Sequence, residues 1–430
     1  MAANIEKISA RKVGQKRRKL NFRFIGLEVD TTLFVLIVVL LVMGIIMMFS
    51  ASYATALNES GDGYSYVKNQ LFCAALGLAV MYITSHLDYN FFFNTKIAYL
   101  FYAVSFALCA YTSVAGIEVA GAKRWLDLFG ITFQPSEILK IAYIIVFAYI
   151  LAVNFKHFEK SLKYCTMPFI ILMGITMGLL MTQRHMSAVM IFAVIGVSMM
   201  FASGMPRKHF WIFIGICGGA ALIGGLIMLA LKGGNFGYIS DRIKSWQDPM
   251  SDPSNTTHQT YESLLAIGSG GWFGLGFGES RQKYLYLPES QNDFIFSIIV
   301  EELGFAGGLT VVLLFVLFML KGFQIAVSAR DRFGMLLATG ITVQISMQAL
   351  LNVMVATNGF PNTGISLPFF SAGGTALILQ LFEMGILLSV SRQNLKRSAA
   401  KRIKAKDEAR RAADEEEGKN GSRNVGHAQS

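Results

Sequence analysis

Long apolar segments recur along most of this chain, and they constrain its fold more than any other feature. A helix that crosses a bilayer needs about 20 apolar residues in succession, and on that template we count about ten segments. They lie at residues 31–52, 67–84, 97–114, 138–153, 167–181, 187–203, 210–231, 303–320, 335–356 and 367–390. The sequence therefore predicts an all-α, polytopic membrane protein with about ten transmembrane helices.

The composition agrees with this fold class. Of the 430 residues, 53% are hydrophobic and only 15% are charged, whereas a soluble domain carries about a quarter charged residues. The net charge of +11 is concentrated in the two tails and in short loops, as expected for cytoplasmic segments, so it does not indicate a nucleic-acid partner. The four cysteines lie in or beside apolar segments and predict neither disulfides nor a metal site.

The basic residues predict the orientation. Cations cluster in the first 30 residues, in three loops and in the tail that follows the last apolar segment. The three loops are residues 156–163, 207–208 and 321–332. An even number of spans places all of them in the cytoplasm, together with both termini. The expected organisation is a basic tail (1–30), a membrane domain (31–392) and a charged, largely disordered tail (393–430) that can bind anionic lipid.

The large outer loop, residues 232–292, separates the seventh span from the eighth. A carboxylate, Asp293, follows it at the start of an apolar helix that we expect to run from residue 292 to 320. One long helix would be roughly 43 Å, longer than the about 30 Å hydrocarbon core, so its first turns should protrude. The helix dipole favours an ionised Asp293 there, whereas partial burial raises its pKa. A carboxylate so placed can act as a general base; the alternative is an aspartate that only caps the helix.

Two further outer segments carry polar groups. The first, residues 121–140, contains Lys123 and Arg124, which can contact a phosphate or simply extend to the membrane surface. Its Glu137 and Lys140 lie three residues apart on one helical face and can form an ion pair. The second, residues 358–376, contains several glycines and prolines, which indicate an irregular entry into the last span.

Glu301 and Glu302 lie deeper in the helix that follows Asp293. Adjacent helical residues point about 100° apart, so the two carboxylates cannot face one partner. Because acids at this depth are costly unless they are paired, we expect a structural pairing for at least one of them.

Together these segments resemble the SEDS family (shape, elongation, division and sporulation proteins). The similarity covers about residues 30–392 and rests on several motifs in a fixed order. They are GAKRW followed by QPSEILK, AIGSGGWFG, LPES–NDFIF–EELG and PNTGISLPFFSAGG. The run SRQKYLYLPES is more similar to the division branch, FtsW and its sporulation relative SpoVE, than to the elongation branch, RodA.

This resemblance implies a peptidoglycan glycosyltransferase that polymerises lipid II at the outer face of the bacterial plasma membrane, at the division septum. Asp293 matches the essential aspartate of the family and would be the catalytic base. Six residues would bind the substrates, including the undecaprenyl-pyrophosphate-linked glycan: Lys123, Arg124, Arg242, Gln259, Arg281 and Lys283. Six more would support the site: Glu137, Lys140, Ser269, Glu302, Ser371 and Gly373. Whether a divalent cation, Mg²⁺ or Mn²⁺, assists stays open.

The resemblance also implies a partner, because no S-x-x-K motif opens a soluble transpeptidase domain in this sequence. Crosslinking would come from a class B penicillin-binding transpeptidase, alongside other division proteins. The alternatives are a lipid II flippase, a non-catalytic division scaffold, or an elongation or sporulation polymerase. The sequence departs from the family at QRHMSAV, where His185 replaces an acid and Arg184 a proline, and at Ala372, which replaces a tyrosine. Glu383 has no counterpart in the family pattern.

Overall fold

The structure is a computed structural model of the chain, and most of the membrane part is described. The described residues are 23–24, 27–119, 122–128, 131–155, 166–183, 185–231, 237–253, 255, 257–395 and 407–408. The predicted loop 156–163, most of the predicted N-terminal tail and nearly all of the predicted C-terminal tail lie outside them. Arg184 also lies outside them. The properties expected of these segments stay predictions.

Helices make up most of the described chain. They are α2 (Thr31–Ser60), α3 (Ser65–His86), α4 (Thr95–Ala115), α5 (Pro135–Asn154), α7 (Met167–Thr182), α8 (Met186–Ala202), α9 (Arg207–Leu231), α10 (Gly237–Gln247), α11 (His258–Ser269), α12 (Ile295–Val327), α13 (Arg332–Ala356) and a C-terminal helix, Gly374–Leu395. A short 3-10 helix, η1 (Tyr89–Phe92), links α3 to α4.

Each apolar segment predicted to span the membrane coincides with a helix, and the all-α polytopic fold class is confirmed. Within the described residues, seven helices are long and apolar enough to cross a bilayer: α2, α3, α4, α5, α12, α13 and the C-terminal helix. Helices α7 and α8 are apolar but shorter, at 16 and 17 residues, and α9 has 25 residues. The number of ten spans, and the place of the long loop between the seventh and eighth, stay predictions.

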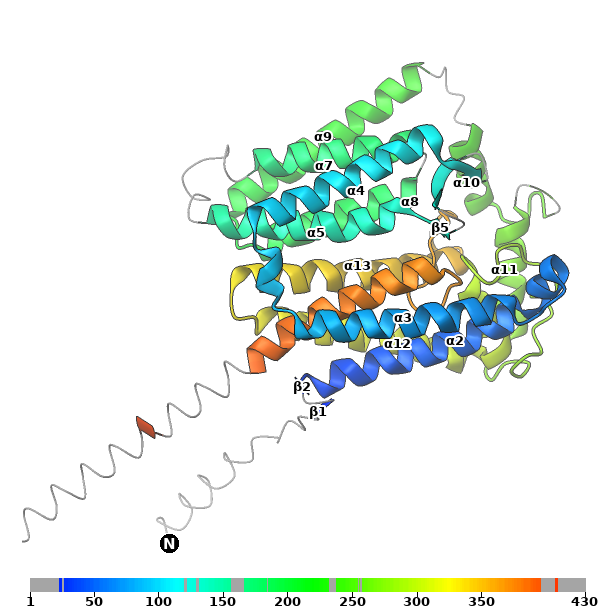
Figure 1. The fold of residues 1–430 in the computed structure, drawn as a ribbon. Coiled ribbons are helices and arrows are strands. Elements are labelled where there is room, and N and C mark those ends of the chain that lie inside the picture. The colour runs from blue at the N-terminus through cyan, green and yellow to red at the C-terminus, as the bar shows by residue number, and fades with distance from the viewer. Residues whose placement is uncertain are drawn as a thin grey trace, which may run out of the picture.

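The helices form one bundle whose centre is α5, α13 and the C-terminal helix. In the most apolar stretch of α5 and of α13, 72% of the residues are buried, compared with 22% in α4, so α4 lies at the periphery. Helix α12 packs against α13, α2 and α11. Figure 1 shows α10, α11 and the strand β5 gathered at one end of the bundle, whereas α2 begins at the opposite end.

Two small sheets are the part of the fold that an all-α prediction did not include. Strands β1 (Arg23–Phe24) and β2 (Leu27–Glu28) form a short antiparallel pair. Strands β3 (Ile117–Val119), β4 (Ala122–Leu128) and β5 (Ile131–Phe133) form a three-stranded antiparallel sheet, with Trp125 opposite Ile117 and Leu126 opposite Phe133.

The register of the sheet distinguishes two adjacent cations. Ile117 lies opposite Trp125, and the next residue, Glu118, lies opposite Lys123, so the pairing skips Arg124. An extra residue of this kind interrupts the regular alternation of side chains and re-aims the side chain that it carries. Lys123 is a paired residue of β4, whereas Arg124 is the unpaired one.

Helix α12 is not the single uninterrupted helix that was predicted from residue 292. It begins at Ile295, so Asp293 precedes its first turn, and it is broken at Gly304, whose φ is 72° and ψ is -173°. The loop that follows α11 makes the hydrogen bonds that the broken helix cannot. The carbonyls of Glu301 and Glu302 accept from the N–H groups of Leu275 and Gly276, at 2.9 and 3.0 Å.

The same loop also accepts hydrogen bonds from the far side of the break. The N–H of Phe305 donates to the carbonyl of Gly271 at 2.8 Å, and the N–H of Ala306 donates to Trp272 at 3.2 Å. Irregular backbone at membrane depth is tolerated where protein covers it, and here the loop provides that cover. The loop after α11 is thereby fixed to α12 on the side that carries Asp293.

Gly274 is required for this contact. A Cβ at this position would lie 2.1 Å from the carbonyl oxygen of Glu302, and its φ is +82°. Gly278 has almost the same φ, +84°, but a Cβ there would meet nothing within 4 Å. A substitution at Gly278 therefore meets only the strain of the left-handed backbone. A substitution at Gly274 meets that strain and also a clash with the backbone of α12.

We expect Gly278→Ala to lower the free energy of unfolding by roughly 1–2 kcal/mol, the cost of a left-handed conformation for an L-residue. Gly274→Ala should cost clearly more, because it adds a backbone clash at the break in α12. Thermal unfolding of the purified variants, followed by intrinsic fluorescence, measures both. Equal midpoints for the two variants would contradict the proposed role of the contact.

Candidate active site

Asp293 lies where the segment that precedes α12 meets the segment that leads into the C-terminal helix. The Ser371 hydroxyl donates to the carbonyl of Asn292 at 2.6 Å. The N–H of Ala372 donates to the carbonyl of Gln291 at 2.9 Å. The two outer segments that the sequence singled out, around residues 293 and 371, therefore pack side by side.

Asn352, near the outer end of α13, fixes the backbone at Asp293. Its amide nitrogen donates to the carbonyl of Asp293 at 2.7 Å and to the carbonyl of Ile365 at 2.6 Å. Asn352 is fully buried. One side chain thus sets the spacing between the backbone of Asp293 and the segment opposite it.

The Asp293 carboxylate faces bare backbone at Gly364. A Cβ on Gly364 would lie 3.1 Å from Oδ2 of Asp293, and the φ of Gly364 is +66°. An L-residue is strained in that conformation, and its side chain would press on the carboxylate. Glycine at this position therefore lets the backbone lie close to the Asp293 carboxylate without a side chain between them.

The pKa of Asp293 is raised from 3.8 to about 6, chiefly by burial and secondly by the nearby charge of Glu289. Arg242 and Arg124 act in the opposite direction and lower it. The two raising effects prevail over the arginines. At neutral pH the carboxylate is therefore mostly ionised, yet it is a stronger base than an ordinary aspartate.

Two of the predicted cations act on this carboxylate. An Arg242 Nη1 N–H, from α10, donates to the carbonyl of Asn362, two residues before Gly364. Arg124 belongs to β4, and its charge lowers the pKa of both Asp293 and His185. Lys123 is directed elsewhere: its ammonium donates to the carbonyl of Val114, at the end of α4, at 3.1 Å.

Lys283 does not face the Asp293 site. Its side chain is only 3% exposed, and its ammonium lies 3.0 Å from Glu302 Oε1 and 3.2 Å from the Ser50 hydroxyl. It also donates to the carbonyl of Gly278. These three contacts occupy the three N–H donors of an ammonium. The geometry favours a structural role for Lys283 in place of the expected contact with a diphosphate.

The neighbouring acid, Glu301, is paired in a similar way. It accepts from the Ser280 hydroxyl at 2.5 Å and from the N–H of Arg281 at 3.0 Å. Glu301 and Glu302 thus hold different residues of one loop, which agrees with their divergent directions on the helix. The expectation of a structural pairing is confirmed for both.

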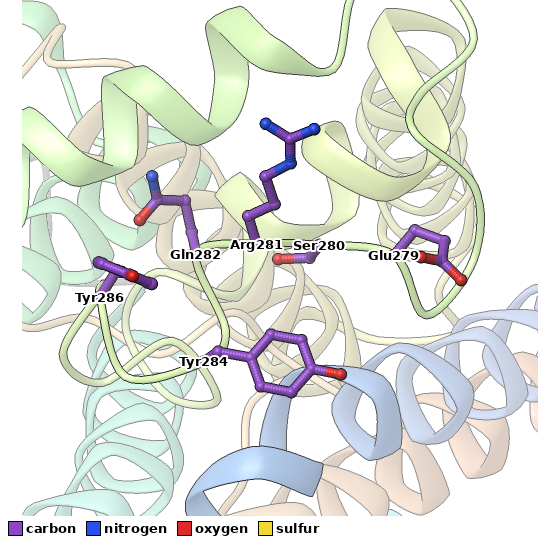
Figure 2. Close-up of a pocket in the computed structure, with 6 residues that line it drawn as sticks. All are labelled: Glu279, Ser280, Arg281, Gln282, Tyr284 and Tyr286. Carbon is purple, nitrogen blue, oxygen red and sulfur yellow. The ribbon is translucent and has the colours of Figure 1, made fainter.

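Arg281 lies on the outer surface of this loop. Its side chain lines an open cleft of about 530 Å³. The other lining residues are Glu279, Ser280, Gln282, Tyr284 and Tyr286. Figure 2 shows the Arg281 guanidinium and the Tyr284 ring extending to opposite sides of the loop. Asp293 does not line this cleft, so the structure does not bring Arg281 together with the carboxylate.

A small polar cavity of about 40 Å³ lies behind Gly364. Glu137 and Lys140 of α5 line it and form the predicted ion pair, at 2.8 Å. Lys140 also donates to Gln348 of α13 at 3.0 Å. The cavity has room for a water molecule, which needs about 10–15 Å³. The pair thus forms a polar floor beneath the segment that faces Asp293.

His185, which stands where the family pattern has an acid, lines the same cavity. Its pKa is lowered to about 3, chiefly by burial and also by the charges of Arg124 and Lys140. The ring is therefore neutral at physiological pH. It cannot supply the negative charge that an acid would place beside Lys140.

The remaining predicted site residues have structural contacts. Gln259 accepts from the Asn362 amide at 2.8 Å, and Asn362 is the same residue whose carbonyl accepts from Arg242. The Ser269 hydroxyl bonds locally to the carbonyl of Ala266. The N–H of Gly373 donates to Gln70 of α3 at 3.3 Å.

Three amides of α13 were missed by the sequence reasoning. Gln344, Gln348 and Asn352 recur every four residues and form one polar stripe on an apolar helix. Gln344 donates to Glu383 of the C-terminal helix at 2.6 Å, which gives this acid a partner. The regular spacing of amides within an apolar segment was the signal that could have identified them.

A metal ion is not held by a preformed cluster in the part of the chain that the structure describes. No three His, Cys, Asp or Glu side chains group closely enough there to bind one. Near Asp293 the other acid is Glu289, and the two arginines oppose a cation. The residues present do not fit a divalent ion held by protein side chains alone.

Comparison with known proteins identifies related chains. A family model described as a cell cycle protein, covering FtsW, RodA and SpoVE, matches residues 31–396. A probable peptidoglycan glycosyltransferase FtsW from Trichlorobacter lovleyi is 36% identical over 85% of this chain and 93% of the relative. Stage V sporulation protein E from Bacillus subtilis is 35% identical over 84% of this chain and 97% of the relative.

Solved structures share the fold. A chain from a structure titled "Structural coordination of polymerization and crosslinking by a peptidoglycan synthase complex" has a TM-score of 0.67 and 24% identity, covering 85% of this chain and 98% of that one. The rod shape determining protein RodA from Thermus thermophilus has a TM-score of 0.61 and 24% identity, covering 85% and 97%.

We predict that Lys283→Met lowers the free energy of unfolding by about 3–5 kcal/mol, because it leaves the buried Glu302 charge unpaired. Arg281→Met, two residues away on the exposed side of the loop, should stay within about 0.5 kcal/mol of the parent. Thermal unfolding of both variants measures this difference. A stable Lys283→Met protein that bound its anionic substrate weakly would restore the phosphate-binding role.

Proposed function

This chain belongs to the family of FtsW, RodA and SpoVE, and we propose from this membership that it is a peptidoglycan glycosyltransferase that polymerises lipid II. The relatives that carry this activity in their names align over most of their length. The observation that supports the assignment most directly is Asp293, a carboxylate with a pKa of about 6 that lies against the glycine backbone at position 364 and within the influence of two arginines.

In this mechanism Asp293 removes the proton from the 4-hydroxyl of the acceptor sugar. The oxygen attacks the anomeric carbon of the donor chain, and the bond from that carbon to undecaprenyl pyrophosphate breaks with inversion. Asp293 ends the step protonated and returns the proton to water. A base whose pKa lies just below the working pH suits this transfer.

The departing diphosphate needs positive charge at the moment it forms. Arg242 and Arg124 are the predicted cations whose charges reach Asp293, and both present planar guanidinium groups that match phosphate oxygens. We assign the diphosphate to these two residues. Lys123 and Lys283, whose ammonium groups are engaged at Val114 and at Glu302, are not part of this group.

A lipid II flippase is the main alternative, and the intramembrane acids were its chief support. Glu137 is paired with Lys140, Glu302 with Lys283, and Glu301 with Ser280. Fixed pairs of this kind support a scaffold around Asp293 better than they support acids that change partners during transport.

The protein would act in the bacterial plasma membrane at the septum, with both termini in the cytoplasm. A class B penicillin-binding transpeptidase would supply crosslinking. Support comes from the related complex whose title joins polymerisation to crosslinking, and from the basic loops that predict the orientation. The division role is supported by the FtsW relatives, and a sporulation role by stage V sporulation protein E.

We expect Asp293→Asn to lower the rate of glycan polymerisation by at least about 100-fold, the usual contribution of a general base. The assay uses the purified full chain with its transpeptidase partner and labelled lipid II, with products resolved on gels. Asp62→Asn, at an exposed aspartate that pairs with Lys68, is the matched control and should keep full activity. Undiminished polymerisation by Asp293→Asn would remove the base assignment.

The pH dependence gives a separate test. Polymerisation should fall as the pH drops through about 6, because the base must be ionised to accept a proton. Glu289→Gln removes a charge that raises the Asp293 pKa, so the acid limb should move to lower pH. Arg242→Gln removes a charge that lowers it, so the limb should move to higher pH. The measurement is kcat/KM as a function of pH for the parent and both variants. If the acid limb moves in the same direction in both variants, or does not move in either, a group other than Asp293 titrates.

A further inference from the structure

Two aromatic side chains project from the loop that follows α11. Trp272 is 72% exposed and Phe273 is 87% exposed. They occupy the segment whose backbone is hydrogen-bonded across the break in α12. Large apolar side chains held outward on a fixed backbone require a partner that is not water.

The burial pattern of α12 shows where lipid contact begins on this helix. From Ile295 to Glu302 every residue is buried. After the break, exposed apolar side chains recur every four residues on one face: Phe305, Leu309, Leu313 and Leu317. The portion from Phe305 to Val327 is roughly 34 Å long at 1.5 Å per residue, close to the about 30 Å hydrocarbon core. Phe305 thus marks the edge of the bilayer core.

Trp272 lies at that same level. Its ring packs edge-to-face on the Phe305 ring, with centroids 5.3 Å apart. Its carbonyl accepts from the N–H of Ala306 at 3.2 Å. The aromatic pair therefore extends the lipid-facing stripe of α12 at its outer end. Trp is enriched at this depth because its ring is apolar and its N–H can reach water or headgroups.

We propose that Trp272 and Phe273 insert into the lipid leaflet on the side of the Asp293 loop, the outer leaflet in the predicted orientation. The chemical partner is the boundary between phospholipid headgroups and acyl chains. The anchored segment continues directly into the residues that Glu301 and Glu302 hold. Insertion would therefore fix the height of the active-site loop relative to the membrane surface. This inference does not depend on the proposed glycosyltransferase activity.

Photo-crosslinking tests the proposal. The photoreactive residue p-benzoylphenylalanine replaces Phe273 in the full chain, and cell membranes are irradiated before purification and mass spectrometry. Position 313, in place of Leu313, is the lipid-facing control, and position 286, in place of Tyr286 on the outward cleft, is the control away from lipid. We expect phospholipid adducts at 273 and 313 and none at 286. A protein adduct at 273, or a result like that at 286, would overturn the proposal.

Fluorescence provides an independent measurement on the purified protein. In proteoliposomes made with phospholipids brominated near the headgroup end of the acyl chain, Trp272→Phe should reduce the quenched fraction of the emission. Trp246→Phe, on α10, should not, because the Trp246 N–H is bonded to the Asn358 carbonyl. An unchanged quenched fraction in Trp272→Phe would show that the indole lies outside the bilayer.

Discussion

The break at Gly304 is the constraint on which the outer half of this protein depends. A helix interrupted at the membrane surface leaves carbonyl and N–H groups that need partners, and two adjacent buried acids need partners as well. The loop after α11 supplies both kinds. Its backbone pairs with Glu301, Glu302, Phe305 and Ala306, and its Ser280 and Lys283 pair with the two carboxylates. The loop that leads to Asp293 is therefore held in place by its contacts with the broken part of α12.

Amide side chains inside the bundle form a second set of fixed contacts. The amides of α13 hold polar groups at successive turns of the helix, beginning with the backbone of Asp293. Asn352 holds its backbone, Gln348 holds Lys140 and Ser366, and Gln344 holds Glu383. Amides keep the same charge at every pH, so this stripe stays in place while Asp293 gains and loses a proton. The arrangement separates the group that titrates from the groups that position it.

The apolar segments could be predicted from the sequence because helix length and hydropathy are local properties. The location of Asp293 just before an apolar helix could be predicted too, because it follows a proline-containing loop, and its catalytic role stays a proposal. The partners of the cations could not. Lys283 and Arg281 are two residues apart, yet one is buried against Glu302 and the other lines an open cleft. Only the distant α12 decides between them.

The surroundings of Lys123 and Arg124 on β4 could not be predicted from the local sequence either. From the sequence, both could contact a phosphate or simply extend to the membrane surface, but in the structure the pairing of β3 with β4 includes Lys123 and skips Arg124. Only Arg124 reaches the surroundings of Asp293. The single uninterrupted helix from residue 292 was wrong for a related reason. The left-handed conformation of Gly304 is stabilised by hydrogen bonds to residues about thirty positions earlier, which no local pattern records.

Gly364 has a consequence for how this site can change over evolution. Its left-handed backbone disfavours any side chain, and an added Cβ would lie 3.1 Å from Oδ2 of Asp293, so the carboxylate would have to shift. The same glycine lines the Glu137–Lys140 cavity. A substitution at this one position would therefore disturb the proposed base and the polar cavity at the same time.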